Sequence, residues 1–197
     1  MPRSHATASR RMPHEAAAYR LKVTLRGSSP EIWRRVVVGA DSTLARLHDV
    51  IQLAMGWENA HLHCFTIGGR RYGTPSPDDW TPVLDERKVK LVQVAPGRSR
   101  SFAYEYDFGD SWLHDVIVEE ALRDADPATL PTCLEGGRAC PPEDSGGVPA
   151  YEEKLAILAR PRHPEHREIA EWLGDFDPDA FNLEAVNERL AGLRRGR

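Results

Sequence analysis

Acidic, aromatic and histidine side chains are concentrated in one short block of this 197-residue chain, residues 104–115, with the sequence YEYDFGDSWLHD. Six acidic residues and no lysine or arginine lie between positions 102 and 120. A tight turn at Gly109 would hold Asp107, Asp110 and His114 near one another. Such a group can raise a carboxylate pKa by desolvation, bind a divalent metal or orient His114 as a general base. The alternative is structural, with carboxylates bonded to turn amides and a histidine inside a polar network.

The order of residues within the block predicts which side chains share a face. Alternate residues of a strand point to opposite faces of a sheet. A strand over residues 102–108 would place its aromatic side chains, including Phe108, on one face and Glu105 and Asp107 on the other. The candidate binding residues of the block are Tyr106, Asp110, Trp112 and His114.

Two histidines, His61 and His63, are two residues apart in a predicted strand, so they are expected to point the same way, with Cys64 opposite. Two imidazoles on one face can form half of a zinc site. Asp110 and His114 are the candidates that would complete it. The alternative is that both histidines belong to the sheet surface or to the edge of the core. A divalent metal such as zinc is the cofactor that these residues suggest.

A loop rich in glycine and proline, residues 133–147 with the sequence CLEGGRACPPEDSGG, carries further acidic candidates. Its two cysteines are separated by six residues, which is too far for a compact zinc knuckle. Glu143 and Asp144 either cap the helix that follows or reach a site as bases. The candidate catalytic residues are Asp107, Glu143 and Asp144.

Positive charge is concentrated near the beginning of the chain. The net charge is −4, yet residues 1–40 carry eight basic and two acidic side chains, so that stretch is +6 and the remainder is −10. Arg20 and Lys22 in the first strand, with Arg194 and Arg195 near the C-terminus, are candidate contacts to nucleic-acid phosphates. A solvated strand face and a helix C-terminus stabilised by its dipole explain these residues equally well.

The composition is typical of a globular protein, with 41% hydrophobic and 28% charged residues. The sequence contains no run of eighteen apolar residues and no apolar stretch of the kind that a secretory signal needs. Three cysteines are an odd number, which favours reduced thiols or a metal over disulfides. We therefore expect a cytoplasmic protein that does not contact a membrane.

Apolar periodicity predicts the first three elements. Residues 19–26 alternate apolar and basic side chains, and residues 31–38 are rich in β-branched residues, which together predict an antiparallel hairpin. Its solvent face would carry Arg20, Lys22 and Arg34 or Arg35. A helix follows, which begins at one of the capping residues 41–43 and ends at Gly56. Its apolar face comprises Leu44, Leu47, Ile51 and Met55.

The remaining pattern places strands first and helices later, which indicates an α+β fold. Strands are expected at residues 62–67, 70–73, 88–94, 102–108 and 112–120, with irregular segments at 74–87 and 124–147. Helices are expected near residues 149–158, 165–173 and 182–193. The predicted fold is a roll-like mixed or antiparallel sheet of five to six strands, one helix after the first hairpin and three C-terminal helices. Residues 1–17 are expected to be a disordered tail, and residues 18–195 a single domain.

Several of these motifs together resemble the plasmid pRiA ORF-three-like family, over nearly everything from Tyr19 to Leu193. The resemblance is carried by Trp57, His61-Leu62-His63-x-Phe65, Tyr106-Asp107-Phe108-Gly109-Asp110-x-Trp112-x-His114, Cys133, Ala139-Cys140-Pro141-Pro142-Glu143-Asp144-x-Gly146-Gly147, Tyr151, Asp177-Pro178-x-x-Phe181 and Asn187. It implies an α+β roll with no established activity. One relative is a passenger of an insertion element and is labelled resolvase-like, which implies a DNA-associated role.

The sequence leaves two classes of function open. The first is a binding or accessory module, associated with mobile DNA, whose partner is DNA or another protein. The second is a metal-dependent hydrolase or nuclease with His61, His63, Asp110 and His114 as ligands and Glu143 or Asp144 as base. A serine recombinase is not supported, because the sequence has no arginine cluster around a serine and no helix-turn-helix pattern.

Overall fold

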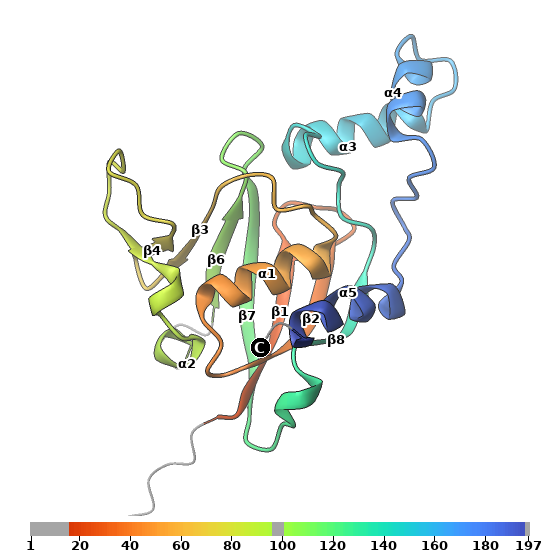
Figure 1. Cartoon of the computed structure of the whole chain (residues 1–197). Coiled ribbons are helices and arrows are strands. Elements are labelled where there is room, and N and C mark those ends of the chain that lie inside the picture. Colours follow the sequence, from red (N-terminus) through yellow and green to blue (C-terminus); the bar gives the residue numbers. More distant parts are fainter. Residues whose placement is uncertain (1–15, 96–100, 196–197) are drawn as a thin grey trace, which may run out of the picture.

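The computed structural model describes residues 16–95 and 101–195 (Figure 1). In this part of the chain, one eight-stranded sheet has the order β5-β4-β3-β6-β7-β1-β2-β8. Neighbouring strands are antiparallel except β4 and β5, which are parallel. The strands are β1 (Ala18–Leu25), β2 (Trp33–Gly39), β3 (His63–Ile67), β4 (Arg70–Gly73), β5 (Val83–Asp85), β6 (Ser101–Tyr106), β7 (Trp112–Leu122) and β8 (Thr132–Gly137).

The helices lie over one face of the sheet and beyond one of its ends (Figure 1). α1 (Leu44–Met55) crosses the sheet, and α5 (Leu183–Arg195) packs against α1 and β8. α3 (Gly147–Leu158) and α4 (His166–Leu173) pack on each other past the end of the sheet. The short elements are α2 (Leu91–Val94) and the 3-10 helices η1 (Glu86–Lys88) and η2 (Pro127–Thr129). None of the described helices is long and apolar enough to cross a membrane.

The predicted α+β class is confirmed, but the sheet has more strands than the five or six that were expected. The two additional strands are β5 and β8, which lie inside the segments predicted to be irregular. β5 has only three residues, and β8 has the glycine-rich sequence TCLEGG, so neither shows the alternation of apolar and polar residues that marks a strand. Both depend on pairing with a neighbouring strand.

The strand predicted over residues 88–94 is wrong, because this segment contains helix α2. Its sequence alternates in the manner of a strand, but tertiary hydrogen bonds direct the backbone elsewhere. The amide of Leu91 donates to Ser42 O (2.8 Å) and that of Val92 donates to Ala40 O (2.8 Å). The side chain of Gln93 accepts a hydrogen bond from the Lys90 amide (2.7 Å) and closes the first turn of the helix.

The core lies between α1 and the sheet. Thr43 caps α1 by accepting a hydrogen bond from the Arg46 amide (3.1 Å), and Gly56 ends it in the left-handed conformation (φ 105°). Both ends of the helix therefore follow the sequence prediction. The apolar face of α1 is fully buried against alternate residues of β1, which include Leu21, Val23 and Leu25.

Arg34 carries its charge inside this core, whereas Arg35 lies on the solvent face of the sheet. Arg34 is 3% exposed and has no carboxylate partner among the described residues. Its Nε donates to Ala54 O (2.8 Å) in the last turn of α1, and its Nη1 donates to Gly137 O (3.0 Å). The guanidinium also lies over the ring of Phe181 (4.7 Å to the centroid). Because the C-terminus of a helix is the negative end of its dipole, these carbonyls offset the cost of burying the cation.

α5 covers the edge of the sheet at β8. The side chain of Asn187 accepts a hydrogen bond from the Cys133 amide (2.8 Å) and donates one to the Cys133 carbonyl (2.9 Å). One amide side chain thus takes the place of the backbone of a further strand. This arrangement satisfies the edge and leaves it less able to pair with another chain.

Among the described residues, two histidines are buried in the core. His114 is 0% exposed, with the rings of Trp57 (5.2 Å) and Tyr104 (5.4 Å) against it, and its ring nitrogens have no hydrogen-bond partner of good geometry. His48 is 4% exposed and stacks on His63. Burial lowers the pKa of His48 and that of His114 to about 4 in each case. Both rings are therefore neutral at pH 7.

These pKa shifts predict a loss of stability in acid. An unfolded histidine titrates near pH 6.5, so the unfolded chain binds more protons than the folded chain between pH 6.5 and 4. The contribution of these histidines to the free energy of unfolding is complete above pH 6.5. It is lost as the pH falls towards 4, by at most about 1.4 kcal/mol per pH unit for each histidine. Urea unfolding between pH 5 and 7.5 measures this slope.

The variant His114→Phe removes one of the two groups and should reduce the slope, because an apolar ring has no proton to gain. His163→Gln is the matched control for the loss of a histidine outside the core. Equal slopes for wild type and His114→Phe would contradict the assignment of a neutral, buried His114.

Candidate functional site

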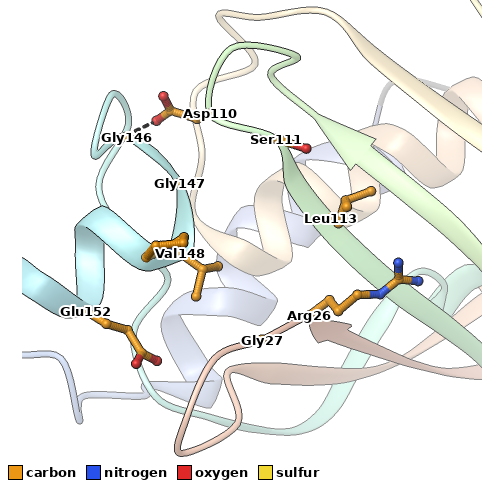
Figure 2. A pocket seen from close by; sticks show the side chains of 10 residues that line it. Arg26, Gly27, Asp110, Ser111, Leu113, Gly146, Gly147, Val148 and Glu152 are labelled. Carbon is orange, nitrogen blue, oxygen red and sulfur yellow. Dashed lines mark hydrogen bonds between the residues drawn. The ribbon is translucent and has the colours of Figure 1, made fainter.

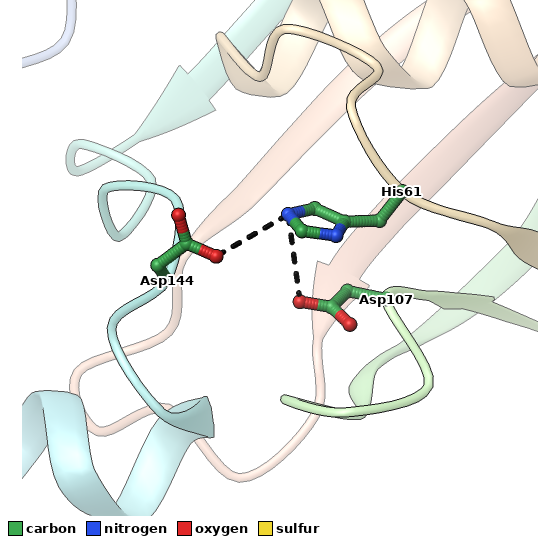
Figure 3. Close-up of side chains that lie close together, drawn as sticks. All are labelled: His61, Asp107 and Asp144. Carbon is green, nitrogen blue, oxygen red and sulfur yellow. Dashed lines mark ion pairs between the residues drawn. The ribbon is translucent and has the colours of Figure 1, made fainter.

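Three segments that are distant in the sequence meet at one end of the sheet. They bring together four side chains, His61, Asp107, Glu143 and Asp144, which we call the His61 cluster. The Nε2 atom of His61 lies 3.4 Å from Asp144 Oδ1, 3.7 Å from Glu143 Oε2 and 3.8 Å from Asp107 Oδ2. Figure 3 shows the imidazole between the carboxylates of Asp107 and Asp144.

The loop that carries His61, residues 57–61, is tied to the loop that carries Glu143. The indole nitrogen of Trp57 donates to Pro141 O (3.0 Å), and the backbone amide of Glu58 donates to Glu143 Oε1 (2.9 Å). These hydrogen bonds fix the position of one loop relative to the other. They explain how side chains more than eighty residues apart can face one another.

The hydroxyl group of Tyr106 is the third tie between these loops. It accepts a hydrogen bond from the Ala60 amide (2.9 Å) and a longer one from the His61 amide (3.3 Å), and it donates to Glu143 Oε1 (3.1 Å). The pKa of Tyr106 is raised to about 12, mainly by burial, while the two amides lower it and the nearby charge of Glu143 raises it. The phenol therefore keeps its proton and remains a donor to the carboxylate.

Asp107 enters the cluster because β6 ends at Tyr106, two residues earlier than predicted. Its backbone is left-handed (φ 54°), a conformation that aspartate tolerates better than most residues. This interrupts the strand alternation, so Asp107 is 8% exposed, and Phe108, which was expected to share a face with the buried Tyr106, is 47% exposed. Its Oδ1 accepts from the Gly109 amide (2.9 Å), which leaves Oδ2 for His61.

Asp110 joins the turn between β6 and β7 to the loop before α3. Its Oδ2 accepts a hydrogen bond from the Gly146 amide (2.8 Å). Gly147 adopts φ 79°, and a Cβ atom at this position would lie 2.5 Å from Asp110 O. Only glycine permits this close approach of the two backbones. Asp110 therefore ties the turn to the loop before α3, and its carboxylate is not part of the His61 cluster.

Negative charge at this end of the sheet lacks basic partners. Within the described residues, the carboxylates of Asp107, Glu143 and Asp144 lie 3.4–3.8 Å from His61 Nε2 and form no ion pair with a lysine or arginine. The later acidic residues of the 102–120 segment differ. Arg26 lowers the pKa of Asp115 by a hydrogen bond, and Arg35 does the same for Glu119. The carboxylates of the His61 cluster therefore form a local concentration of negative charge that would attract a cation.

The four predicted ligands His61, His63, Asp110 and His114 are not brought together. β3 begins at His63, so His61 lies in a loop and the two rings diverge. The Nε2 atom of His63 lies 2.8 Å from Glu86 Oε2, and its ring stacks on His48 with a centroid distance of 3.4 Å. His114 and Trp112 are both fully buried in the core, so they are packing residues and do not face the cluster.

The structure offers a different ligand set. One nitrogen of His61 and one oxygen each of Asp107 and Asp144 lie within 4.8 Å of one another. This is the one group of three or more potential ligands within the described ranges 16–95 and 101–195. Ligand atoms about 2.0–2.1 Å from a tetrahedral zinc are about 3.3 Å apart, so distances of 3.4 and 3.8 Å require only small movements.

Two hollows are lined by sequence neighbours of the cluster residues, although no member of the cluster lines either of them. One has a volume of about 610 Å³ and includes Asp110, Gly146 and Arg26 in its lining. Figure 2 shows the Asp110–Gly146 hydrogen bond at its rim, with Val148 and Glu152 of α3 on one side and Leu113 and Arg26 on the other. The second, of about 250 Å³, is lined in part by Leu62 and Phe108, which directly follow His61 and Asp107.

The basic side chains predicted to contact nucleic acid are already engaged. Arg20 pairs with Glu119 and Glu120, and Lys22 pairs with Glu31. Arg194 donates two hydrogen bonds to the carbonyl of Pro131, and the side chain of Arg195 lies outside the described part of the chain. The β1 face therefore carries charges of both signs.

The polar residues His48, Gln52 and Asn59, which hold the His61 loop, were not predicted from the sequence. His48 and Gln52 lie four residues apart on α1 and are 4% and 2% exposed, and Asn59 follows the helix. Polar residues spaced by one helical turn beside an apolar face are a signal that could have identified the first two. Asn59 carries no such pattern.

Comparisons with known proteins agree with the resemblance found in the sequence. The model of the family described as "Plasmid pRiA4b ORF-3-like protein" matches residues 17–185. The chain is 40% identical over 181 residues to the uncharacterised protein y4hQ of Sinorhizobium fredii, which covers 90% of this chain and 93% of that protein.

A solved structure extends this comparison to the fold. It is the crystal structure of a protein of unknown function, MM3350, from Methanosarcina mazei Go1. The TM-score is 0.80 at 38% sequence identity, over 87% of this chain and 97% of the other. The matched family model and these similarities together show that the chain belongs to the plasmid pRiA4b ORF-3-like family.

Proposed function

We propose that the chain is a binding module in which His61, Asp107 and Asp144 hold a divalent metal ion such as zinc. The observation that carries the proposal is the convergence of their three ligand atoms within 4.8 Å. One imidazole nitrogen and two carboxylate oxygens form a donor set that suits Zn²⁺ or Mn²⁺ better than a soft cation such as Cu⁺.

The backbone supports this proposal. Asp107 and Asp144 both have positive φ angles, 54° and 57°, and both contribute carboxylates to the cluster. Such conformations cost energy and recur at functional sites. We expect the module to work in the cytoplasm, because its three cysteines are free and buried.

A calorimetric titration of the full-length, tag-free chain with zinc or manganese chloride tests the proposal. We expect one equivalent to bind at the cluster. His61→Ala and Asp144→Asn should each weaken binding by at least about tenfold, because each removes one ligand. Elemental analysis of the purified protein provides an independent measure of stoichiometry.

The matched controls are His163→Ala and Asp175→Asn, which change the same residue types on the surface away from the cluster. They should bind the metal as wild type does. A double variant of His5 and His14 excludes zinc bound by the N-terminal residues. If wild type binds neither metal, or if His61→Ala binds as tightly as wild type, the proposed site is refuted.

A second candidate function is metal-dependent hydrolysis, and the position of Glu143 favours it. The amide of Glu58 and the hydroxyl of Tyr106 both donate to Glu143 Oε1 and hold the side chain beside the proposed ligands. Three protein ligands leave a position for water, and a fixed carboxylate next to it can accept a proton as general base. Under this candidate, Glu143 is the base.

The variant Glu143→Gln separates hydrolysis from metal binding. Glutamine keeps an oxygen that can accept from Glu58 and Tyr106, but it cannot take a proton. We expect the variant to bind the metal within about threefold of wild type. Its rate of p-nitrophenyl ester or phosphodiester hydrolysis should be at least about 10²-fold lower than that of wild type. Absence of hydrolysis by the metal-loaded wild type would exclude this candidate and would leave the binding module intact.

A further inference from the structure

A buried polar network lies beneath the His61 loop. It comprises His48 and Gln52 of α1 and Tyr104 of β6, which are 4%, 2% and 0% exposed. Gln52 Nε2 donates to the Tyr104 hydroxyl (2.9 Å), and that hydroxyl lies 2.8 Å from His48 Nδ1. Buried groups that satisfy one another in this way are held rigidly, because any displacement leaves a polar atom unpaired.

The network reaches the loop through Asn59. The Nε2 atom of His48 lies 2.8 Å from Asn59 Oδ1, and the backbone amide of Asn59 donates to Gln52 Oε1 (3.0 Å). The roles that satisfy every group have His48 Nε2 donating to Asn59 and His48 Nδ1 accepting from Tyr104. Asn59 is thus held on both its side chain and its backbone.

The backbone conformation of Asn59 connects its anchorage to the position of His61. It is left-handed (φ 58°), and the two following amides both point at the Tyr106 hydroxyl. The ring of His61 then lies edge-on to that of Tyr106, with centroids 5.8 Å apart, and its Nε2 faces the carboxylates. The direction of the proposed ligand therefore follows from the conformation two residues earlier.

We propose that Asn59 is a positioning residue for the His61 cluster, whose anchorage to His48 and Gln52 sets the direction of the His61 imidazole and with it the affinity for the metal. The predicted effect on metal affinity rests on the proposed function. The predicted effect on the direction of the His61 imidazole does not, because it concerns the metal-free chain. Asn59 does not contact the metal. It acts through His61 as an outer hydrogen-bonding partner acts through a metal ligand.

Three substitutions separate the contributions of Asn59. Asn59→Gly keeps the left-handed conformation accessible but removes the side-chain acceptor. Asn59→Asp keeps an acceptor for His48 and tolerates the same backbone conformation. Asn59→Ala removes the acceptor and disfavours the conformation as well.

Zinc affinity by calorimetry should follow this order. We expect Asn59→Asp to bind within about threefold of wild type, Asn59→Gly to bind about tenfold more weakly, and Asn59→Ala to bind more weakly still. Rescue by aspartate is the result that a role in general stability would not produce. Val186→Ala, a truncation of a core residue of α5 that is 2% exposed, is the control for destabilisation.

A second readout does not need metal. The nuclear Overhauser effect between the rings of His61 and Tyr106, measured by NMR on the metal-free chain, reports the direction of the imidazole. It should be present in wild type and Asn59→Asp, and weak or absent in Asn59→Gly and Asn59→Ala. In Val186→Ala it should be retained.

The outcomes distinguish the two proposals. If wild type binds no zinc but Asn59→Gly loses the ring contact, the metal proposal fails and the positioning role stands. If Asn59→Gly keeps both the ring contact and the affinity of wild type, the positioning role is overturned. It is also overturned if Val186→Ala weakens zinc binding as much as Asn59→Gly does.

Discussion

The hydroxyl group of Tyr106 is the interaction on which the candidate site depends. It accepts from the backbone of the His61 loop and donates to the carboxylate of Glu143, so one atom joins three segments. Because Tyr106 is buried at the end of β6 and its pKa is raised to about 12, the hydroxyl remains a neutral donor in a fixed place. The rigidity of the sheet is thereby passed to two loops that would otherwise have no common support.

Charges are unbalanced at the end of the sheet that carries the His61 cluster, but they are balanced on the sheet face that no helix covers. On the open face, arginine and glutamate residues alternate across β1, β2 and β7 and neutralise one another. In the interior, Arg34 is balanced by backbone carbonyls, including one at the end of α1. Around His61, by contrast, three carboxylates share one imidazole. Unbalanced charge held by ordered loops is the physical reason to expect a cation there.

Much of the fold could be predicted because its signals are local. The hairpin of β1 and β2, the caps of α1 and the three C-terminal helices follow from alternation, capping residues and apolar spacing. β5, β8 and α2 could not be predicted, since the first two are short or glycine-rich and the third has a strand-like sequence. Their conformations are set by pairing with β4 and β2 and by hydrogen bonds to the turn before α1.

By itself, the sequence determined the fold class, the family and the segments that carry the candidate site, because these depend on residue types in a fixed order. Only the tertiary structure decided which side chains meet. His61 and His63 look equivalent in the sequence, yet one faces three carboxylates and the other pairs with Glu86. The acidic, aromatic block likewise divides into Asp107 in the cluster, Asp110 at the docking contact and His114 in the core. The physical reason is that left-handed residues at positions 59, 107 and 144 interrupt strand and loop periodicity. Hydrogen bonds to other segments, such as those from the Asn59 amide to Gln52 and from the Asp107 amide to Leu62 O, then help to fix where the side chains lie.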